Sequence, residues 1–219
     1  MDVIIVAAKK ADVNSYLDAI TAAGLTVLIM DVDSFALETM YEANYDFEDN
    51  EIVVIVNVGG GLTNINVIKG GMSIFTRDFT IAGNAITEGL QDRYGVSLEE
   101  AERMKLEGVP GGEQENLDLR NAILECAEPI CAEIERSVDY FRSTFGGDYI
   151  KRVYLSGGSS RIAGLTGHLS QRLNIETEVI NPLLKIGYNK KNIDAGKIES
   201  IKTVGAVAIG LGLRKIGDK

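Results

Sequence analysis

Three consecutive glycines, Gly59 to Gly61, are the residues whose type and spacing most clearly allow chemistry. They separate two strand-like runs, 51–56 and 62–68. Glycine tolerates positive φ and has no Cβ, so backbone N–H groups in such a loop can approach a ligand closely. A concavity of N–H dipoles binds phosphate, and the hydroxyl of Thr63 follows in the sequence. The loop predicts a phosphate site, although the same letters also fit an ordinary hairpin turn.

A second glycine signal, Gly157 and Gly158, lies far downstream. It follows a short strand-like run that begins at Val153, and a helix is predicted after it. A strand that ends in two glycines at the start of a helix is suited to an anion or a nucleotide, because the first N–H groups of a helix are unpaired. The sequence therefore contains two separate stretches that are suited to anions.

The elements that must position the first loop form a predicted β-meander over about 51–80. Gly70 and Gly71 are interpreted as the turn before its third strand, 73–80, and not as another phosphate loop. A helix is then expected from about 81 to Gly95. Together these elements place the first loop at one end of a sheet.

Two further helices are predicted before residue 145. Ser97 and Glu100 have the spacing of a capping box, which opens a short helix to about 107. A long helix over about 115–144 follows, because apolar residues repeat there at spacings of three and four. A coiled coil fits the same stripe, but a single helix packed in a lobe explains it equally well and is preferred.

The two ends of the chain are predicted to mix strands and helices. Before the meander we expect strands at 3–8 and 25–30, helices at 11–23 and after Asp33 or Ser34, and an unpaired edge at the first strand. After the long helix we expect a strand at 149–155, a helix at 161–173, a strand at 177–180, an irregular segment at 183–200 and a final helix at 203–215. Small residues in that final helix allow close approach to another element, although an ordinary packed helix fits as well.

Composition excludes several classes of function. The 219 residues carry a net charge of −10, which argues against a nucleic-acid partner, and no apolar run approaches the ~20 residues of a membrane span.

Cys126 and Cys131 lie on one predicted helix, at least ~7.5 Å apart, so free thiols in a reducing compartment are expected. The single histidine, His168, is predicted to be a solvated surface residue. We predict no catalytic residue and no metal ligand.

Several stretches together resemble a known family. They are Asp2-Val-Ile-Ile-Val-Ala-Ala-Lys-Lys, Asp31-Val-Asp-Ser-Phe-Ala-Leu, Thr63-Asn-Ile-Asn-Val-Ile-Lys-Gly-Gly, Phe75-Thr-Arg-Asp, Ala101-Glu-Arg-Met-Lys and Tyr154-Leu-Ser-Gly-Gly. The two glycine loops resemble the second half of the actin-like ATPase fold, which actin, sugar kinases and heat-shock chaperone ATPases share. Within that superfamily, which also includes FtsA, the chain most resembles the PilM family of type IV pilus assembly proteins.

The resemblance implies an α/β, actin-like (ribonuclease H-like) fold with a complete second lobe and a remnant of the first. The implied divisions are 1–47 for that remnant with part of an inserted 1C-like subdomain, 48–83 with 147–219 for subdomain IIA, and 84–146 for the helical subdomain IIB. The family's first phosphate loop is not found in this sequence. The chain therefore resembles the C-terminal two thirds or so of a family member, either as a truncated form or as a split-gene product.

The resemblance also implies a function. It implies a cytoplasmic scaffold, peripheral to the inner membrane, that binds ATP with Mg²⁺, the N-terminal tail of a PilN-like membrane protein and other pilus assembly proteins, with possible self-association. The implied nucleotide-binding residues are Asn57, Gly59, Gly60, Gly61, Leu62, Thr63, Glu102, Lys105, Gly157, Gly158 and Arg161. For Glu102 and Lys105 the implied role is contact with the ribose and base, and an ordinary solvated helix face fits Glu102 as well.

One departure from the family pattern argues against efficient hydrolysis. Many actin-like ATPases have an aspartate where this chain has Asn57, and an amide brings no charge to a metal or water. The expected activity is at most a weak ATPase. Two alternatives stay open: an interaction module without nucleotide, and half of a sugar- or acid-kinase-like phosphotransferase.

Overall fold

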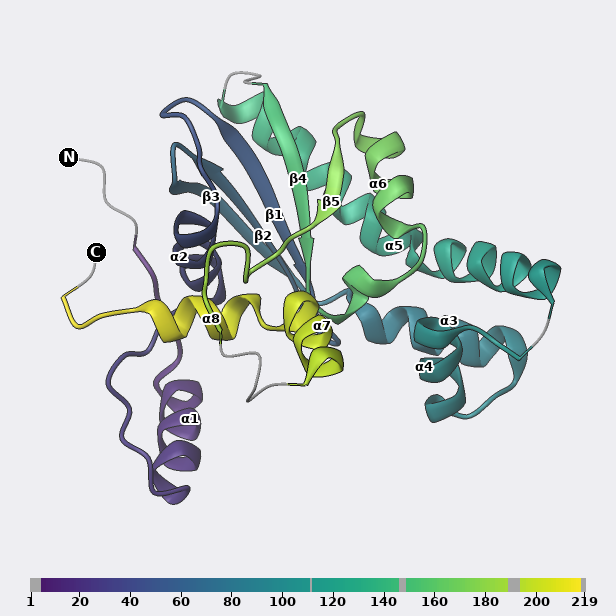
Figure 1. The fold of residues 1–219 in the computed structure, drawn as a ribbon, viewed down its shortest axis with the longest axis horizontal. Helices are drawn as coiled ribbons and strands as arrows, with labels where there is room; N and C mark the ends of the chain where they lie inside the picture. Colours follow the sequence, from purple (N-terminus) through teal and green to yellow (C-terminus); the bar gives the residue numbers. More distant parts are fainter. Residues whose placement is uncertain (1–4, 111, 146–148, 189–193, 218–219) are drawn as a thin grey trace.

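The computed structural model describes residues 5–110, 112–145, 149–188 and 194–217 (Figure 1). Its centre is a five-stranded sheet with the order β3-β2-β1-β4-β5. The strands are β1 (Ile52–Val58), β2 (Thr63–Lys69), β3 (Met72–Phe79), β4 (Ile150–Ser156) and β5 (Thr177–Val179). Strands β1 to β3 form the predicted antiparallel meander, and β4 and β5 add in parallel on the other side of β1.

Helices pack on both faces of this sheet and lie beside it. They are α1 (Lys10–Ala22), α2 (Asp33–Asn44), α3 (Gly83–Tyr94), α4 (Leu98–Glu107), α5 (Glu113–Phe145), α6 (Leu165–Leu173), α7 (Ala195–Val204) and α8 (Ala206–Leu213), with a 3-10 turn, η1 (Gly158–Arg161). Helices α3 and α4 and the first part of α5 project to one side of the sheet (Figure 1). The division into subdomains stays a prediction.

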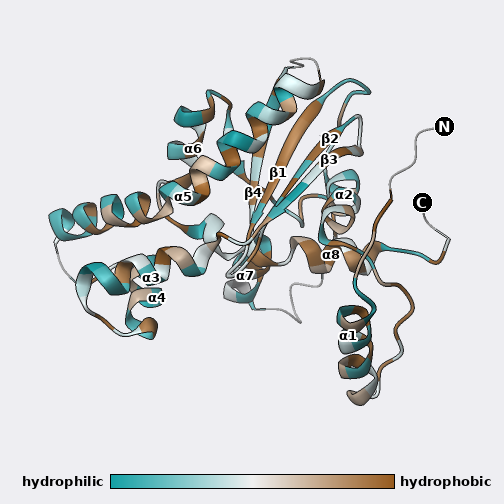
Figure 2. Ribbon diagram, turned by 180° about the vertical axis from the view of Figure 1, so that it is seen from behind, coloured by the Kyte–Doolittle hydropathy of each residue, from teal (hydrophilic) through white to brown (hydrophobic). Residues whose placement is uncertain are grey.

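Strand β1 is buried on both faces, because side chains alternate between two cores. Ile52, Val54 and Val56 belong to the larger core, which also contains side chains from α3, α5 and α6. Val53 and Ile55 belong to the smaller core under α2 and α8. The strand is accordingly hydrophobic along most of its length (Figure 2). A strand buried in this way holds the loop at its C-terminal end on a rigid base.

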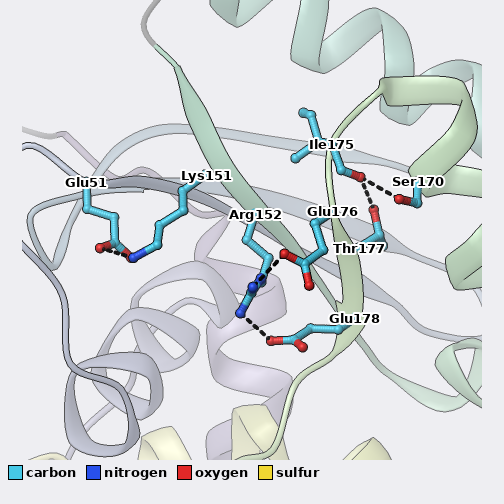
Figure 3. Close-up of polar contacts among 8 residues, drawn as sticks. All are labelled: Glu51, Lys151, Arg152, Ser170, Ile175, Glu176, Thr177 and Glu178. Atoms are coloured by element: carbon cyan, nitrogen blue, oxygen red, sulfur yellow. Dashed lines mark hydrogen bonds and ion pairs between the residues drawn. The ribbon is translucent and has the colours of Figure 1, made fainter.

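The edge strand β5 is fixed to β4 by an arginine fork (Figure 3). Arg152 on β4 contacts Glu176 at 2.6 Å and Glu178 at 3.1 Å. The backbone carbonyl of Ile175 accepts hydrogen bonds from the side chains of Ser170 and Thr177. These contacts explain how a three-residue strand stays paired at the edge of the sheet.

The strands predicted before the meander are wrong for the described residues. Residues 5–9 and 25–32 belong to no strand, whereas residues 3 and 4 lie outside the described chain. Leu25 and Leu28 are exposed, and α1 buries none of its residues. An apolar run forms a strand only when a neighbour accepts its backbone hydrogen bonds, and the described residues offer none here. The predicted unpaired edge at 3–8 is therefore also not a strand within residues 5–8.

Helix starts and ends differ from the prediction at three places. Val32, without a side-chain cap, precedes α2, so neither Asp33 nor Ser34 caps it. The predicted helix 161–173 begins only at Leu165, after η1. The predicted final helix is two helices that meet at Gly205, and α7 extends into the segment predicted to be irregular. In contrast, Ser97 caps α4 as expected, accepting a hydrogen bond from the Glu100 N–H at 3.2 Å.

Candidate functional site

The triglycine loop joins β1 to β2 and is clamped to the start of α3. The Gly59 N–H donates to the Leu62 carbonyl at 3.0 Å, which closes the turn. The Gly83 N–H donates to the Gly59 carbonyl at 2.9 Å, and the Asn84 N–H donates to the Gly60 carbonyl at 2.7 Å. The first N–H groups of α3 therefore hold the loop by its carbonyl oxygens.

This clamp determines where the loop's own N–H groups point. In a trans peptide the N–H lies opposite the preceding carbonyl. Because the carbonyls of Gly59 and Gly60 face α3, the N–H groups of Gly60 and Gly61 point away from it. Neither N–H has a hydrogen-bond partner among the described residues. Two adjacent free N–H groups form the kind of positive concavity that binds an anion.

The reason for glycine in this loop differs from the one expected. The described glycines with positive φ include Gly70 and Gly71 of the next turn, but none of Gly59 to Gly61. Space is limiting instead: a Cβ on Gly59 would lie 3.1 Å from the Leu62 carbonyl oxygen, and one on Gly60 would lie 3.1 Å from Asn84 Oδ1. The loop therefore does not use the positive φ that glycine allows, whereas it does use close backbone approach.

The second glycine stretch lies directly against the first. Parallel pairing sets Asn57 on β1 beside Ser156 on β4, and Gly157 follows with φ of 86°. A Cβ on Gly157 would lie 2.3 Å from the Val58 carbonyl oxygen and 3.0 Å from Asn57 Oδ1. The Gly157 N–H donates to the Thr203 carbonyl at the end of α7, at 2.9 Å. The two stretches that the sequence marks for anions are thus neighbours.

A row of polar side chains crosses three strands beside the loop. Asn57 Nδ2 donates to Asn64 Oδ1 at 3.1 Å, and Asn64 Nδ2 donates to Asp78 Oδ1 at 2.9 Å. Burial, and secondarily the charge of Asp78, raise the pKa of Asp33 at the start of α2. Sequence reasoning missed Asn64, Asp78 and Asp33. The available signal was the antiparallel register, which sets Asn57 opposite Asn64 and Asn64 opposite Asp78.

Lys105 and Glu102 lie together on α4, close to the start of α3. The Lys105 side chain is only 5% exposed, and its Nζ lies 2.6 Å from Glu102 Oε2. Lys105 Nζ also donates to Thr87 Oγ1 at 2.8 Å and to the Gly83 carbonyl at 3.2 Å. Burial raises the pKa of Glu102, but the hydrogen bonds from Lys105 and Thr87 and the lysine charge outweigh it, so the net shift is downward.

The remaining predicted site residues differ in how they are placed. Thr63 is fully buried, and its hydroxyl donates to the Ile81 carbonyl at 2.9 Å. Leu62 is partly exposed, and a Cβ on Gly158 would meet no atom within 4 Å. Arg161 is exposed, and its side chain has no hydrogen bond or ion pair within the described part of the chain. The geometry assigns none of these four a specific contact with a ligand.

The cysteines and the histidine, the other side chains with reactive groups, are buried or half-buried among neighbouring side chains. Cys126 and Cys131 are free thiols, as expected, and burial raises the pKa of Cys131 to about 12. His168 is not the solvated residue predicted: it is half-buried on α6, with its Nε2 2.7 Å from Glu128 Oε1 on α5. Within the described ranges, no three His, Cys, Asp or Glu side chains gather as a metal site.

None of the described helices is both long enough and apolar enough to cross a bilayer.

Comparison with known structures shows the fold. A structure of a PilM-PilN type IV pilus biogenesis complex matches with a TM-score of 0.82 and 26% identity, over 94% of this chain and 58% of that one. The ethanolamine utilization protein EutJ from Carboxydothermus hydrogenoformans matches with a TM-score of 0.63 and 20% identity, over 95% of this chain and 62% of that one. MreB5 of Spiroplasma citri, in a structure with ADP, matches with a TM-score of 0.65 and 14% identity, over 94% of this chain and 65% of that one.

These matches and the sheet topology establish an actin-like α/β fold, as predicted. The chain spans less than two thirds of the length of each of these three proteins. The family model described as type IV pilus assembly protein PilM matches residues 1–216. Since that match covers almost the whole sequence, the chain belongs to the PilM family of type IV pilus assembly proteins.

Proposed function

We propose that this chain is a nucleotide-binding scaffold of type IV pilus assembly, in which the loop Gly59–Gly61 binds the phosphates of ATP. The observation that carries the proposal is the pair of N–H groups on Gly60 and Gly61, which no described residue bonds and which the first N–H groups of α3 hold in place through the loop carbonyls. Such a pair favours an anion, and Gly157 brings a second close-packed turn to the same end of β1. The described residues thus fit the phosphate part of a nucleotide.

We propose that Mg²⁺ accompanies the nucleotide and neutralises phosphate charge. Magnesium usually takes one or two carboxylates together with phosphate and water oxygens. Asp78 supplies a carboxylate at the end of the polar row that starts at Asn57. Asn57 itself is neutral, so this wall of the site adds little charge to stabilise phosphoryl transfer. The chain therefore acts as a scaffold with at most weak ATPase activity.

We further propose that the scaffold engages the N-terminal tail of a PilN-like inner-membrane protein. Family membership and the likeness to the PilM-PilN complex support this partner. In this proposal the chain lies on the cytoplasmic side of the inner membrane, held there through its partners, which include other pilus assembly proteins.

Isothermal titration of Mg-ATP into the chain tests the nucleotide proposal. Gly60 does not need positive φ, and Asn84 Oδ1 at 3.1 Å from its Cβ position belongs to a side chain that can move, so Gly60→Asp is compatible with folding. We expect micromolar binding by the unchanged chain. In Gly60→Asp the new carboxylate repels phosphate, and affinity falls by about tenfold or more, which corresponds to ~1.4 kcal/mol.

Gly167→Asp is the matched control, because it adds the same charge at an exposed helical glycine with no atom within 4 Å of its Cβ position. Its ATP affinity should equal that of the unchanged chain. Absence of heat from the unchanged chain, combined with capture of a PilN-like tail peptide in a pull-down, would instead identify an interaction module that works without nucleotide.

A further inference from the structure

Lys105 is a buried cation whose three N–H donors are all engaged. Its Nζ contacts the Glu102 carboxylate, the Thr87 hydroxyl and the Gly83 carbonyl, at 2.6, 2.8 and 3.2 Å. An ammonium group has three N–H bonds and no acceptor. None of them is left for a ligand unless one of these contacts breaks.

The partners of Lys105 connect helix α4 to the phosphate loop. Lys105 and Glu102 belong to α4, whereas Gly83 and Thr87 belong to the first turns of α3. Gly83 accepts a hydrogen bond from Lys105 with its carbonyl and donates one from its N–H to the Gly59 carbonyl. Gly83 therefore links the lysine to the loop through one hydrogen bond on each side.

Packing around Gly83 leaves little room for adjustment. A Cβ on Gly83 would lie 2.6 Å from Ser159 Oγ, 2.9 Å from the Gly59 carbonyl oxygen and 3.7 Å from Lys105 Nζ. Burying a charge is costly unless it is paired and hydrogen-bonded. Here that paired charge fixes a backbone carbonyl at the junction between two helices and the loop. The geometry therefore suits a rigid support for the loop.

We propose that Lys105 is a positioning residue, which braces the start of α3 and thereby holds the Gly60 and Gly61 N–H groups toward phosphate. This inference rests on the proposed function, and it differs from the contact with ribose and base that the family resemblance implies. This brace, which consists of the contacts between Lys105 and the start of α3, affects only how tightly the phosphate part of a ligand binds. A ligand contact to ribose or base would act on the nucleoside part alone, so the two roles are separable.

Titration with two ligands tests the brace. Mg-ATP and Mg-tripolyphosphate are titrated into the unchanged chain, Lys105→Met and Lys151→Met. Lys151 is the control, because its 2.7 Å pair with Glu51 (Figure 3) lies where β1 begins, whereas the glycine loop follows the end of β1. We expect Lys105→Met to weaken both ligands by the same factor, about tenfold or more, because a hydrogen bond to a charged group is lost. Lys151→Met should bind both as before.

A different pattern would overturn the brace. If Lys105→Met weakened ATP but left tripolyphosphate unchanged, the lysine would contact the nucleoside. Thr87→Val provides a milder test that keeps the charge and removes only the hydroxyl, and Thr87→Ser restores it. We expect Thr87→Val to weaken both ligands and Thr87→Ser to bind as the unchanged chain does; equal binding by all three would contradict the brace.

Hydrogen exchange separates failure of the brace from failure of the proposed function. If the unchanged chain binds neither ligand, phosphate binding is refuted, but the brace still predicts faster exchange of the Gly83 and Asn84 N–H groups in Thr87→Val and Lys105→Met. These groups donate to the loop carbonyls, so they report the clamp directly. Unchanged exchange there, in folded variants, would overturn the brace.

Discussion

At Gly157 the backbone conformation requires glycine, whereas at Gly60 only crowding disfavours a larger residue. Gly157 has φ of 86°, a region that residues with a Cβ rarely adopt, and its Cβ position lies 2.3 Å from the Val58 carbonyl oxygen. At Gly60 the neighbour is the side chain of Asn84, which can move. Substitutions at the two loops should therefore have different effects on stability.

We expect Gly157→Ala to lower the free energy of unfolding by more than about 2 kcal/mol, because backbone strain and a clash with main chain add together. Gly167→Ala is the control: its position is helical and open, so alanine should raise stability by about 0.5–1 kcal/mol. Urea denaturation measures both. Equal midpoints for the two variants would contradict the strained turn at Gly157.

The Glu102 pair predicts a pH dependence. The pKa of Glu102 is lowered from 4.5 in the folded chain, so its contribution is present above pH 4.5 and is lost as the pH falls through the folded pKa. The side chain is 47% exposed, so solvent screening limits the contribution to about 1 kcal/mol or less. The stability difference between the unchanged chain and Glu102→Gln should shrink as unfolding is measured from pH 7 down to below 4.5. A difference that is constant with pH would contradict the pair.

Among the elements, α8 packs closely against α2. A Cβ on Gly210 would lie 1.8 Å from the Ala36 carbonyl oxygen, so the helices touch through their backbones. Arg214, just after α8, contacts Asp31, just before α2, at 2.5 Å with both side chains largely buried. The small residues of the last helix therefore serve close packing on the sheet's second face.

Two glycines of the same helix give a matched test of this contact. Gly210→Ala should destabilise the fold by more than about 2 kcal/mol, since the added methyl has no space against main-chain atoms. Gly212→Ala, where no atom lies within 4 Å, should stabilise it by up to about 1 kcal/mol through helix propensity. Thermal unfolding of the two variants distinguishes them, and similar melting temperatures would refute the close approach.

The elements that sequence alone predicted well are those with local signals. The meander follows from β-branched runs separated by glycines, and α5 follows from its regular apolar spacing. The break at Gly205 was missed, as was the lack of strand structure at 5–9 and 25–32. Whether a run pairs as a strand depends on a neighbour elsewhere in the chain, and local sequence does not contain that neighbour.

The same limit applies to the candidate site. Both glycine stretches were predicted to suit anions from their own residues. Their contact, however, arises because β1 pairs in parallel with β4, and these two strands are distant in sequence. The bonds from Lys105 to α3 depend on how two helices pack, so the sequence could suggest the residue and not its role.

At the scale of the molecule, the part before α2 is the least packed. Helix α1 lies apart from the sheet (Figure 1) and buries none of its residues, and Ile5, Leu25 and Leu28 are exposed. Segments with few buried contacts open at little cost in free energy. Self-association of the chain stays a prediction.

Hydrogen exchange should show this contrast directly. We expect N–H groups of α1 to exchange faster than those of β1, whose strand is buried on both faces. The control is the buried stretch of α5 around Ile130, a helix of the same chain with a packed face. Protection of α1 equal to that of α5 would show that this segment is packed in solution.

The most direct test of the phosphate site follows the backbone N–H resonances of the triglycine loop by nuclear magnetic resonance while Mg-ATP is added. The N–H groups of Gly60 and Gly61 have no partner in the part of the chain that the structure describes, whereas the Gly59 N–H donates to the Leu62 carbonyl. Binding should therefore shift the Gly60 and Gly61 resonances most and the Gly59 resonance less. Resonances of Gly60 and Gly61 that stay unchanged while ATP shifts those of other residues would contradict phosphate binding at this loop.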